Sequence, residues 1–123
     1  MRCSSSKSAV IITLIKDGQP DDSLRITRAC DGGYYVTLKQ VNLGLKSEQY
    51  YSRMTYVVDY LNKFLQFLSM DNNSSYDWFQ FDIPGLPVVT LNNQDMMNRY
   101  SLLTRAIDDL ALDWPREEFA PQC

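Results

Sequence analysis

The hydrophobic period of this 123-residue chain changes near Ser47 from two residues to 3.6, and this change constrains the fold more than any other feature. A period of two places alternate side chains on opposite faces of a β-strand. A period of 3.6 gathers apolar side chains along one side of a helix. The chain therefore has to combine a sheet, built first, with amphipathic helices that follow.

The first strand is predicted at residues 9–15. This run is short, rich in β-branched residues and apolar at both parities, which is typical of a central strand buried on both faces or nearly so. Residues 17–22 then supply Asp, Gly and Pro, and these residue types indicate a turn.

A hairpin is expected next, formed by residues 24–30 and 34–40 around Asp31-Gly32-Gly33. A three-residue loop would place Ile26 opposite Leu38, so that mostly apolar partners share one face. The other face would then be polar, partly aromatic and basic, with Arg25, Thr27, Tyr35, Thr37 and Lys39.

A long amphipathic helix is predicted from Ser47, its expected N-cap, to the residue before Asp71. Its helically spaced apolar residues are Tyr50, Met54, Val57, Val58, Leu61, Phe64, Leu65 and Leu68. A second, partly aromatic stripe of Tyr56, Tyr60 and Phe67 widens this apolar face. The stripe either packs against a second helix or forms an interface with another chain, and the pattern alone leaves both readings open.

The alternation in residues 78–83 predicts a strand with one buried face and with Trp78 on the opposite side. We expect a bend or open arch at Pro84-Gly85 before a further strand at 88–91.

Asn92 or Asn93 is expected to cap a second amphipathic helix, which would run to Trp114 and stop at Pro115.

This order of elements predicts an α+β fold. We expect a mostly antiparallel sheet of four or five strands in βββα-ββα order, with two amphipathic helices packed on one face. One globular domain would span residues 1–123, with residues 1–8 and 116–123 as frayed tails.

Composition excludes several kinds of chemistry. The chain has no histidine, which excludes Ser-His-Asp and Cys-His catalysis and His-ligated zinc. Cys3, Cys30 and Cys123 lack any metal-ligand spacing and are typical of reduced thiols. We find neither a signal peptide nor an apolar run long enough to span a membrane, so an intracellular protein without membrane contact is expected.

Carboxylates are the remaining candidates for a metal or acid-base site. The nearest cluster in sequence is formed by Asp17, Asp21, Asp22 and Asp31, and it lacks the ligand spacing of an EF-hand loop. Asp108, Asp109 and Asp113 crowd the second helix and are typical of a solubilising face. We therefore expect no metal, no cofactor and no catalytic residue, hence no enzyme; a carboxylate-dependent enzyme is the alternative.

The net charge of −3 divides into +3 for residues 1–46 and −6 for residues 47–123. Together with the abundance of tyrosine, the predicted surfaces indicate a small non-catalytic protein-interaction or assembly module, binding another protein or a second copy as a homodimer. A nucleic-acid-binding sheet platform is the alternative partner class. The expected interaction residues are Arg25, Thr27, Tyr35, Thr37, Lys39, Trp78, Tyr56, Tyr60 and Phe67.

Overall fold

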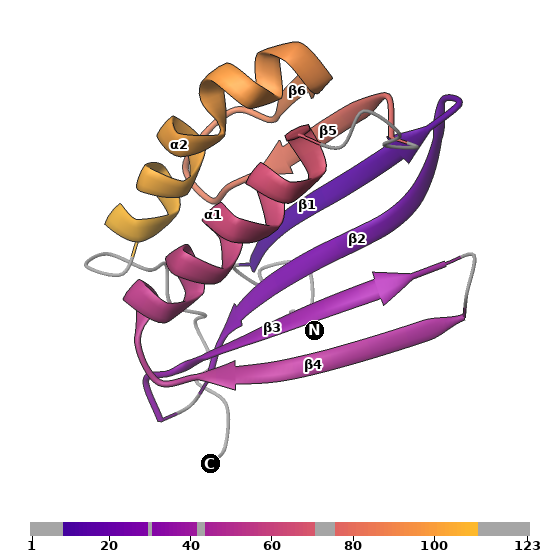
Figure 1. Cartoon of the computed structure of the whole chain (residues 1–123). Helices are drawn as coiled ribbons and strands as arrows, with labels where there is room; N and C mark the ends of the chain where they lie inside the picture. Colours follow the sequence, from indigo (N-terminus) through magenta and orange to yellow (C-terminus); the bar gives the residue numbers. More distant parts are fainter. Residues whose placement is uncertain (1–8, 30, 42–43, 71–75, 111–123) are drawn as a thin grey trace.

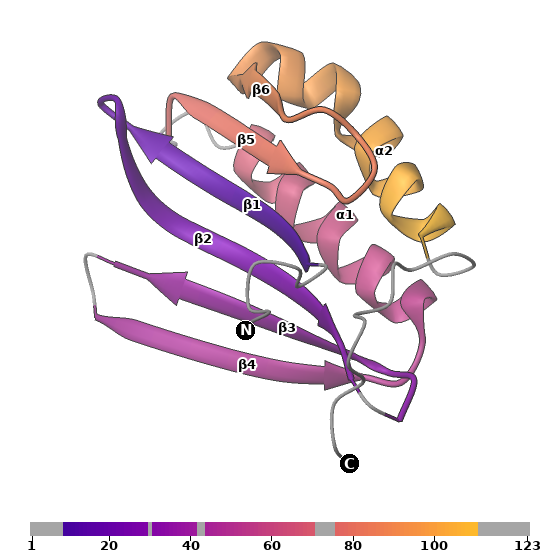
Figure 2. The ribbon, with the colours of Figure 1, turned by 180° about the vertical axis from the view of Figure 1, so that it is seen from behind.

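A computed structural model describes residues 9–29, 31–41, 44–70 and 76–110. They form a six-stranded antiparallel sheet with strand order β4-β3-β2-β1-β5-β6, and both helices lie on one face of it (Figures 1 and 2). The elements are β1 (Ala9–Lys16), β2 (Gln19–Arg28), β3 (Tyr34–Gln40), β4 (Leu45–Tyr51), α1 (Met54–Met70), β5 (Trp78–Asp82), β6 (Val89–Asn92) and α2 (Asn93–Asp109). The predicted α+β class and the placement of both helices on one face are confirmed.

Some predictions fall on residues outside those described. These concern the tails at 1–8 and 116–123, the three cysteines, and the predicted end of the second helix at Trp114 and Pro115. In the described part of the chain, α2 ends at Asp109.

β1 lies inside the sheet, between β2 and β5, as its apolar sequence predicts. Its residues that face the helices are fully buried: Val10, Ile12 and Leu14. On the other face, Ile11 and Ile15 are only half-buried. The prediction of a strand buried on both faces or nearly so is therefore confirmed for the helix-facing side, and the other side is half-buried because neither helix covers it.

The turn between β1 and β2 consists of two residues, Asp17 and Gly18, whose φ angles are 53° and 75°. Positive φ at both central residues matches a type I′ hairpin turn, and Asp-Gly is a preferred sequence for it. The expectation of a longer turn over residues 17–22 is wrong, since β2 begins at Gln19. A register shift after Leu14 places Pro20 at an irregularity of the ladder, where a missing N–H costs least.

The β2–β3 register differs by two residues from the predicted one: Ile26 lies opposite Val36 rather than Leu38. The connecting loop has five residues, and a hydrogen bond of 2.8 Å from the Ala29 N–H to the Gly33 carbonyl closes it. A shift of two residues leaves every side chain on its predicted face.

The largest difference lies at residues 45–51, which form strand β4 and not the first turns of a helix. β4 pairs with β3 at the edge of the sheet, and every side chain except that of Tyr51 is exposed. α1 begins only at Met54, so Ser47, the predicted N-cap, lies within the strand. Tyr50 was expected on the apolar side of the helix and instead lies on β4, on the sheet face away from the helices. An edge strand exposed on both faces shows no apolar alternation, which explains the error.

β5 has the predicted alternation, with Phe79 and Phe81 fully buried and Trp78 exposed. A turn with Gly85 at φ 86° and a 3.0 Å hydrogen bond from the Leu86 N–H to the Ile83 carbonyl follows it. β6 then returns as the antiparallel neighbour of β5.

The two helices pack side by side over the sheet (Figure 1). Leu61 of α1 and Ile107 of α2 are fully buried in the core. α2 starts as predicted: the Asn92 side chain accepts a 2.8 Å hydrogen bond from the Asp95 N–H.

Candidate functional site

The predicted interaction residues lie on two different surfaces. One is the face of the sheet that neither helix covers, called here the open face; it contains Arg25, Thr27, Tyr35, Thr37, Lys39 and Trp78. The other lies on the helix side of the sheet and contains Tyr56, Tyr60 and Phe67 of α1. Each surface must therefore be judged separately.

Acidic side chains interrupt the basic residues of the open face. Arg25 lies opposite Thr37 on one side and opposite Ile11 on the other. The same row continues to Glu48 on β4 and to Asp82 on β5. The Thr37 hydroxyl donates a 3.1 Å hydrogen bond to Glu48 Oε1. Since β4 was not predicted as a strand, its acidic contribution to this face was missed.

The two aromatic residues predicted for this face, Tyr35 and Trp78, lie at opposite corners of it. Tyr35 is opposite Thr27, which is opposite Ala9 at the start of β1, whereas Trp78 is opposite Ile15 near its end. Strand spacing separates them by about 14 Å across the sheet and about 20 Å along it. They are too far apart to stack on neighbouring bases of one nucleic-acid strand.

Tyr50 links β4 to the loop between β2 and β3. Its hydroxyl donates a 2.7 Å hydrogen bond to Asp31 Oδ2, and Asp31 Oδ1 accepts a 2.9 Å bond from the Gly33 N–H. The bond from Tyr50 lowers the pKa of Asp31, and the same bond raises the pKa of Tyr50. A Cβ on residue 33 would lie 2.6 Å from Cζ of the Tyr50 ring, so this contact needs glycine.

The aspartates considered as a metal site do not converge. Asp22 is buried on the helix side of β2, where Oδ1 accepts a 3.1 Å bond from the Val41 N–H and Oδ2 accepts a bond from the Tyr76 hydroxyl. Burial, followed by this bond, raises the pKa of Tyr76. Asp31 lies in the β2–β3 loop, bound to Tyr50. Within the described ranges, no three Cys, Asp or Glu side chains are grouped to hold a metal ion.

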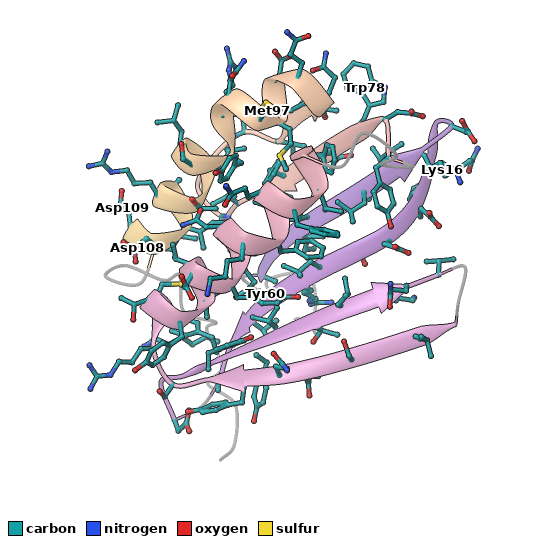
Figure 3. The ribbon with its side chains drawn as sticks, viewed as in Figure 1. Lys16, Tyr60, Trp78, Met97, Asp108 and Asp109 are labelled. Atoms are coloured by element: carbon teal, nitrogen blue, oxygen red, sulfur yellow. The ribbon has the colours of Figure 1, made fainter. Side chains whose placement is uncertain are left out.

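A row of rings on α1, called here the aromatic flank, consists of Tyr56, Tyr60, Phe64 and Phe67. Tyr60 stacks on Phe64 with ring centroids 5.9 Å apart, and it contacts Tyr51 of β4 at 6.0 Å. Figure 3 shows Tyr60 on the side of α1 toward β3 and β4. Tyr56 and Phe67 are 55% and 69% exposed.

The aromatic flank lies on a different side of α1 from α2. The seam between the helices lies on the other side of α1, where the Thr104 hydroxyl donates a 2.8 Å hydrogen bond to Asn62 Oδ1. Of the two readings of the stripe, packing against the second helix is therefore wrong. Within the described chain, Tyr60 and Phe64 pack against the core and Tyr60 also contacts β4, whereas Tyr56 and Phe67 are mostly exposed.

The β3–β4 hairpin carries further apolar side chains on the helix side of the sheet. The ladder places Leu38 and Leu45 on the same side of the sheet as Tyr34 and Tyr51, toward the helices. Leu38 is half-buried, whereas Leu45 is 56% exposed. The aromatic flank, Leu38 and Leu45 together are called here the helix-side surface.

Leu45 was missed as part of this surface because residues 45–51 were not read as a strand. The sequence shows no apolar alternation there, because Ser47 and Gln49, on the same side as Leu45 and Tyr51, are polar.

No protein-family model, curated protein or solved structure matches this chain. Neither α1 nor α2, the helices of the described residues, is long and apolar enough to cross a lipid bilayer.

Proposed function

We propose that this chain is an intracellular protein-interaction module that binds an apolar segment of a partner protein and acts without catalysis. The observation that carries this proposal is the helix-side surface, in which Tyr56 and Phe67 are exposed on the same helix as Tyr60, the ring that contacts β4. Aromatic residues are enriched in the buried centres of protein interfaces, and clustered exposure of large apolar side chains is uncommon in monomers.

The rings are arranged to receive an elongated partner. Tyr56 and Phe67 are eleven residues apart, so they lie on the same side of α1, about 16 Å apart along its axis. Tyr60 and Phe64 occupy the interval and are held by their stacking and by the contact with Tyr51. Covering each exposed ring would stabilise a complex by roughly 1–2 kcal/mol.

The open face supports a binding function less well. Glu48 and Asp82 lower its positive charge, and Tyr35 and Trp78 are widely separated. Phosphate neutralisation by a continuous basic surface supplies most non-specific affinity for nucleic acid. These features favour a protein partner over nucleic acid.

A peptide library selected against the immobilised protein tests this proposal. Phe67→Glu introduces a charge into the helix-side surface, and Leu102→Glu introduces the same charge at a 63% exposed position on α2. We expect enriched peptides rich in aromatic and aliphatic residues, which lose at least about ten-fold in affinity with Phe67→Glu and keep their affinity with Leu102→Glu. Failure to enrich any peptide, or equal binding to both variants, would contradict the proposal.

A further inference from the structure

The two edges of the sheet differ in length and in surroundings. β6 has four residues and leads directly into α2, whereas β4 has seven residues and is exposed along almost its whole length. Within the described part of the chain, no strand pairs with the outer side of β4. A row of unpaired backbone N–H and C=O groups is a template for another strand.

We propose that β4 pairs with β4 of a second copy, antiparallel and centred on Ser47, so that two sheets join into one. This inference rests on the proposed function, because it names a second copy of the chain as one partner of the module. It uses the outer backbone groups of β4, whereas the peptide test changes Phe67 of the aromatic flank, so the two can be tested apart.

The charges on β4 select this register. In a continuous sheet, side chains opposite one another lie on the same face, and Lys46 and Glu48 are on the open face. Centring the pair on Ser47 places Lys46 opposite Glu48 of the second copy, and symmetry forms the same pair twice.

The neighbouring registers lack this match. A centre at Glu48 places two glutamates opposite each other, and a centre at Lys46 places two lysines opposite each other. Like charges directly opposite one another destabilise a strand pair. A centre at Gln49 forms no charge pair. β4 is therefore complementary to itself in one register.

The proposed pairing also orders the helix-side surfaces. Tyr60 contacts Tyr51, so the aromatic flank lies on the β4 side of α1. Two copies joined along β4 would carry their helices on the same face of the joined sheet, with the two aromatic flanks turned toward the symmetry axis. The pair would thus present two neighbouring sites for apolar segments.

Light scattering of the full chain over a range of micromolar concentrations tests the pairing through charge reversal. The wild-type chain is expected to reach the mass of two copies. Lys46→Glu and Glu48→Lys each place like charges in both cross-strand pairs, so each raises the dissociation constant by about ten-fold. An equimolar mixture of these two variants forms two opposite-charge pairs again and should associate as tightly as the wild type.

Lys63→Glu and Asp59→Lys are the matched controls. Lys63 and Asp59 form an exposed ion pair of 3.2 Å on α1 and are not part of β4, and their reversal changes the net charge by the same amounts. These variants should keep the wild-type mass, and circular dichroism should show that all four variants are folded.

A wild-type mass of one copy at every concentration would overturn the inference, as would a mixture that associates no better than each variant alone. If peptide binding survives in that case, the edge pairing fails and the proposed function stands. If the wild-type chain enriches no peptide at all, the proposed function is overturned as well.

Discussion

Asp22 shows how a single buried side chain can join distant parts of the chain. Its two carboxylate oxygens accept from the Val41 N–H and from the Tyr76 hydroxyl, which lies beyond α1 in the sequence. Two donors offset the cost of burying the carboxylate. The predicted solvated turn at residues 17–22 did not anticipate this role, because burial of Asp22 depends on a partner 54 residues away.

Replacing Tyr76 with Phe should lower the free energy of unfolding by roughly 1–3 kcal/mol, because Asp22 Oδ2 would lose its donor in a buried place. Tyr56→Phe, on an exposed ring of the aromatic flank, should change it by less than about 0.5 kcal/mol. Urea unfolding measures both, and equal effects would show that the hydroxyl of Tyr76 does not stabilise the fold.

The raised pKa of Tyr76 also predicts a pH dependence. The folded state holds the proton of the Tyr76 hydroxyl more tightly than the unfolded state does, because tyrosines in an unfolded chain titrate at about pH 10. The contribution of Tyr76 to stability is therefore complete below about pH 10 and is lost as the pH rises toward the folded-state pKa. Urea unfolding in this alkaline range should show a shallower decline for Tyr76→Phe than for the wild type; identical slopes would contradict the assignment. Tyr50 and Tyr60, whose pKa values are also raised, act in the same direction and remain in the variant.

Gly33→Ala should displace the ring of Tyr50 and break its hydrogen bond to Asp31. We expect the pKa of Asp31 to rise and that of Tyr50 to fall toward their ordinary values, as measured by NMR titration of the carboxyl and ring carbons. Tyr50→Phe is the control, since it removes the hydroxyl alone and should also raise the pKa of Asp31. An unchanged Asp31 pKa in Gly33→Ala would show that the loop accommodates the methyl group.

At the scale of elements, the two predicted helix starts had different outcomes. Asn92 caps α2 because a strand ends and an amphipathic segment begins at that residue. Ser47 resembles a cap in sequence, yet it lies in β4, where pairing with β3 determines the backbone. Tertiary pairing outweighs local propensity most easily in a short edge strand, where few apolar residues reveal the pattern.

This difference predicts unequal effects of two small substitutions. Asn92→Ala should lower the free energy of unfolding by about 1 kcal/mol, because the Asp95 N–H would lose its acceptor. Ser47→Ala, at an exposed strand position, should change it by less than about 0.5 kcal/mol. Chemical denaturation that gave the larger loss for Ser47→Ala would contradict the strand assignment.

The helices owe their stability to the side buried on the sheet. Leu61→Ala removes a fully buried side chain of α1 and should cost about 2–5 kcal/mol, and Ile107→Ala should do the same on α2. Leu102→Ala is the control on α2, since this side chain is mostly exposed. Similar unfolding midpoints for Leu61→Ala and Leu102→Ala would show that the buried face is assigned incorrectly.

In the molecule as a whole, the sequence predicts the face of the sheet on which a side chain lies better than it predicts the residues that pack against it. Arg25 and Lys39 lie on the predicted face, although the β2–β3 register is shifted, because a shift of two residues preserves parity. The helix-side surface depends on where α1 crosses the sheet and on a strand that extends beyond it. The hydrophobic periodicity of the sequence reveals neither the position at which α1 crosses the sheet nor the edge strand β4. The contact between Tyr60 and Tyr51 could therefore not be predicted from the sequence.

The proposed function requires that the aromatic flank contact another protein. Site-specific photo-crosslinking tests it most directly, with benzoylphenylalanine placed at residue 67 in the aromatic flank or at residue 102 on α2, both of which are largely exposed. We expect discrete protein adducts from position 67 and none of these from position 102. Absence of adducts at position 67, or the same adducts from both positions, would contradict it.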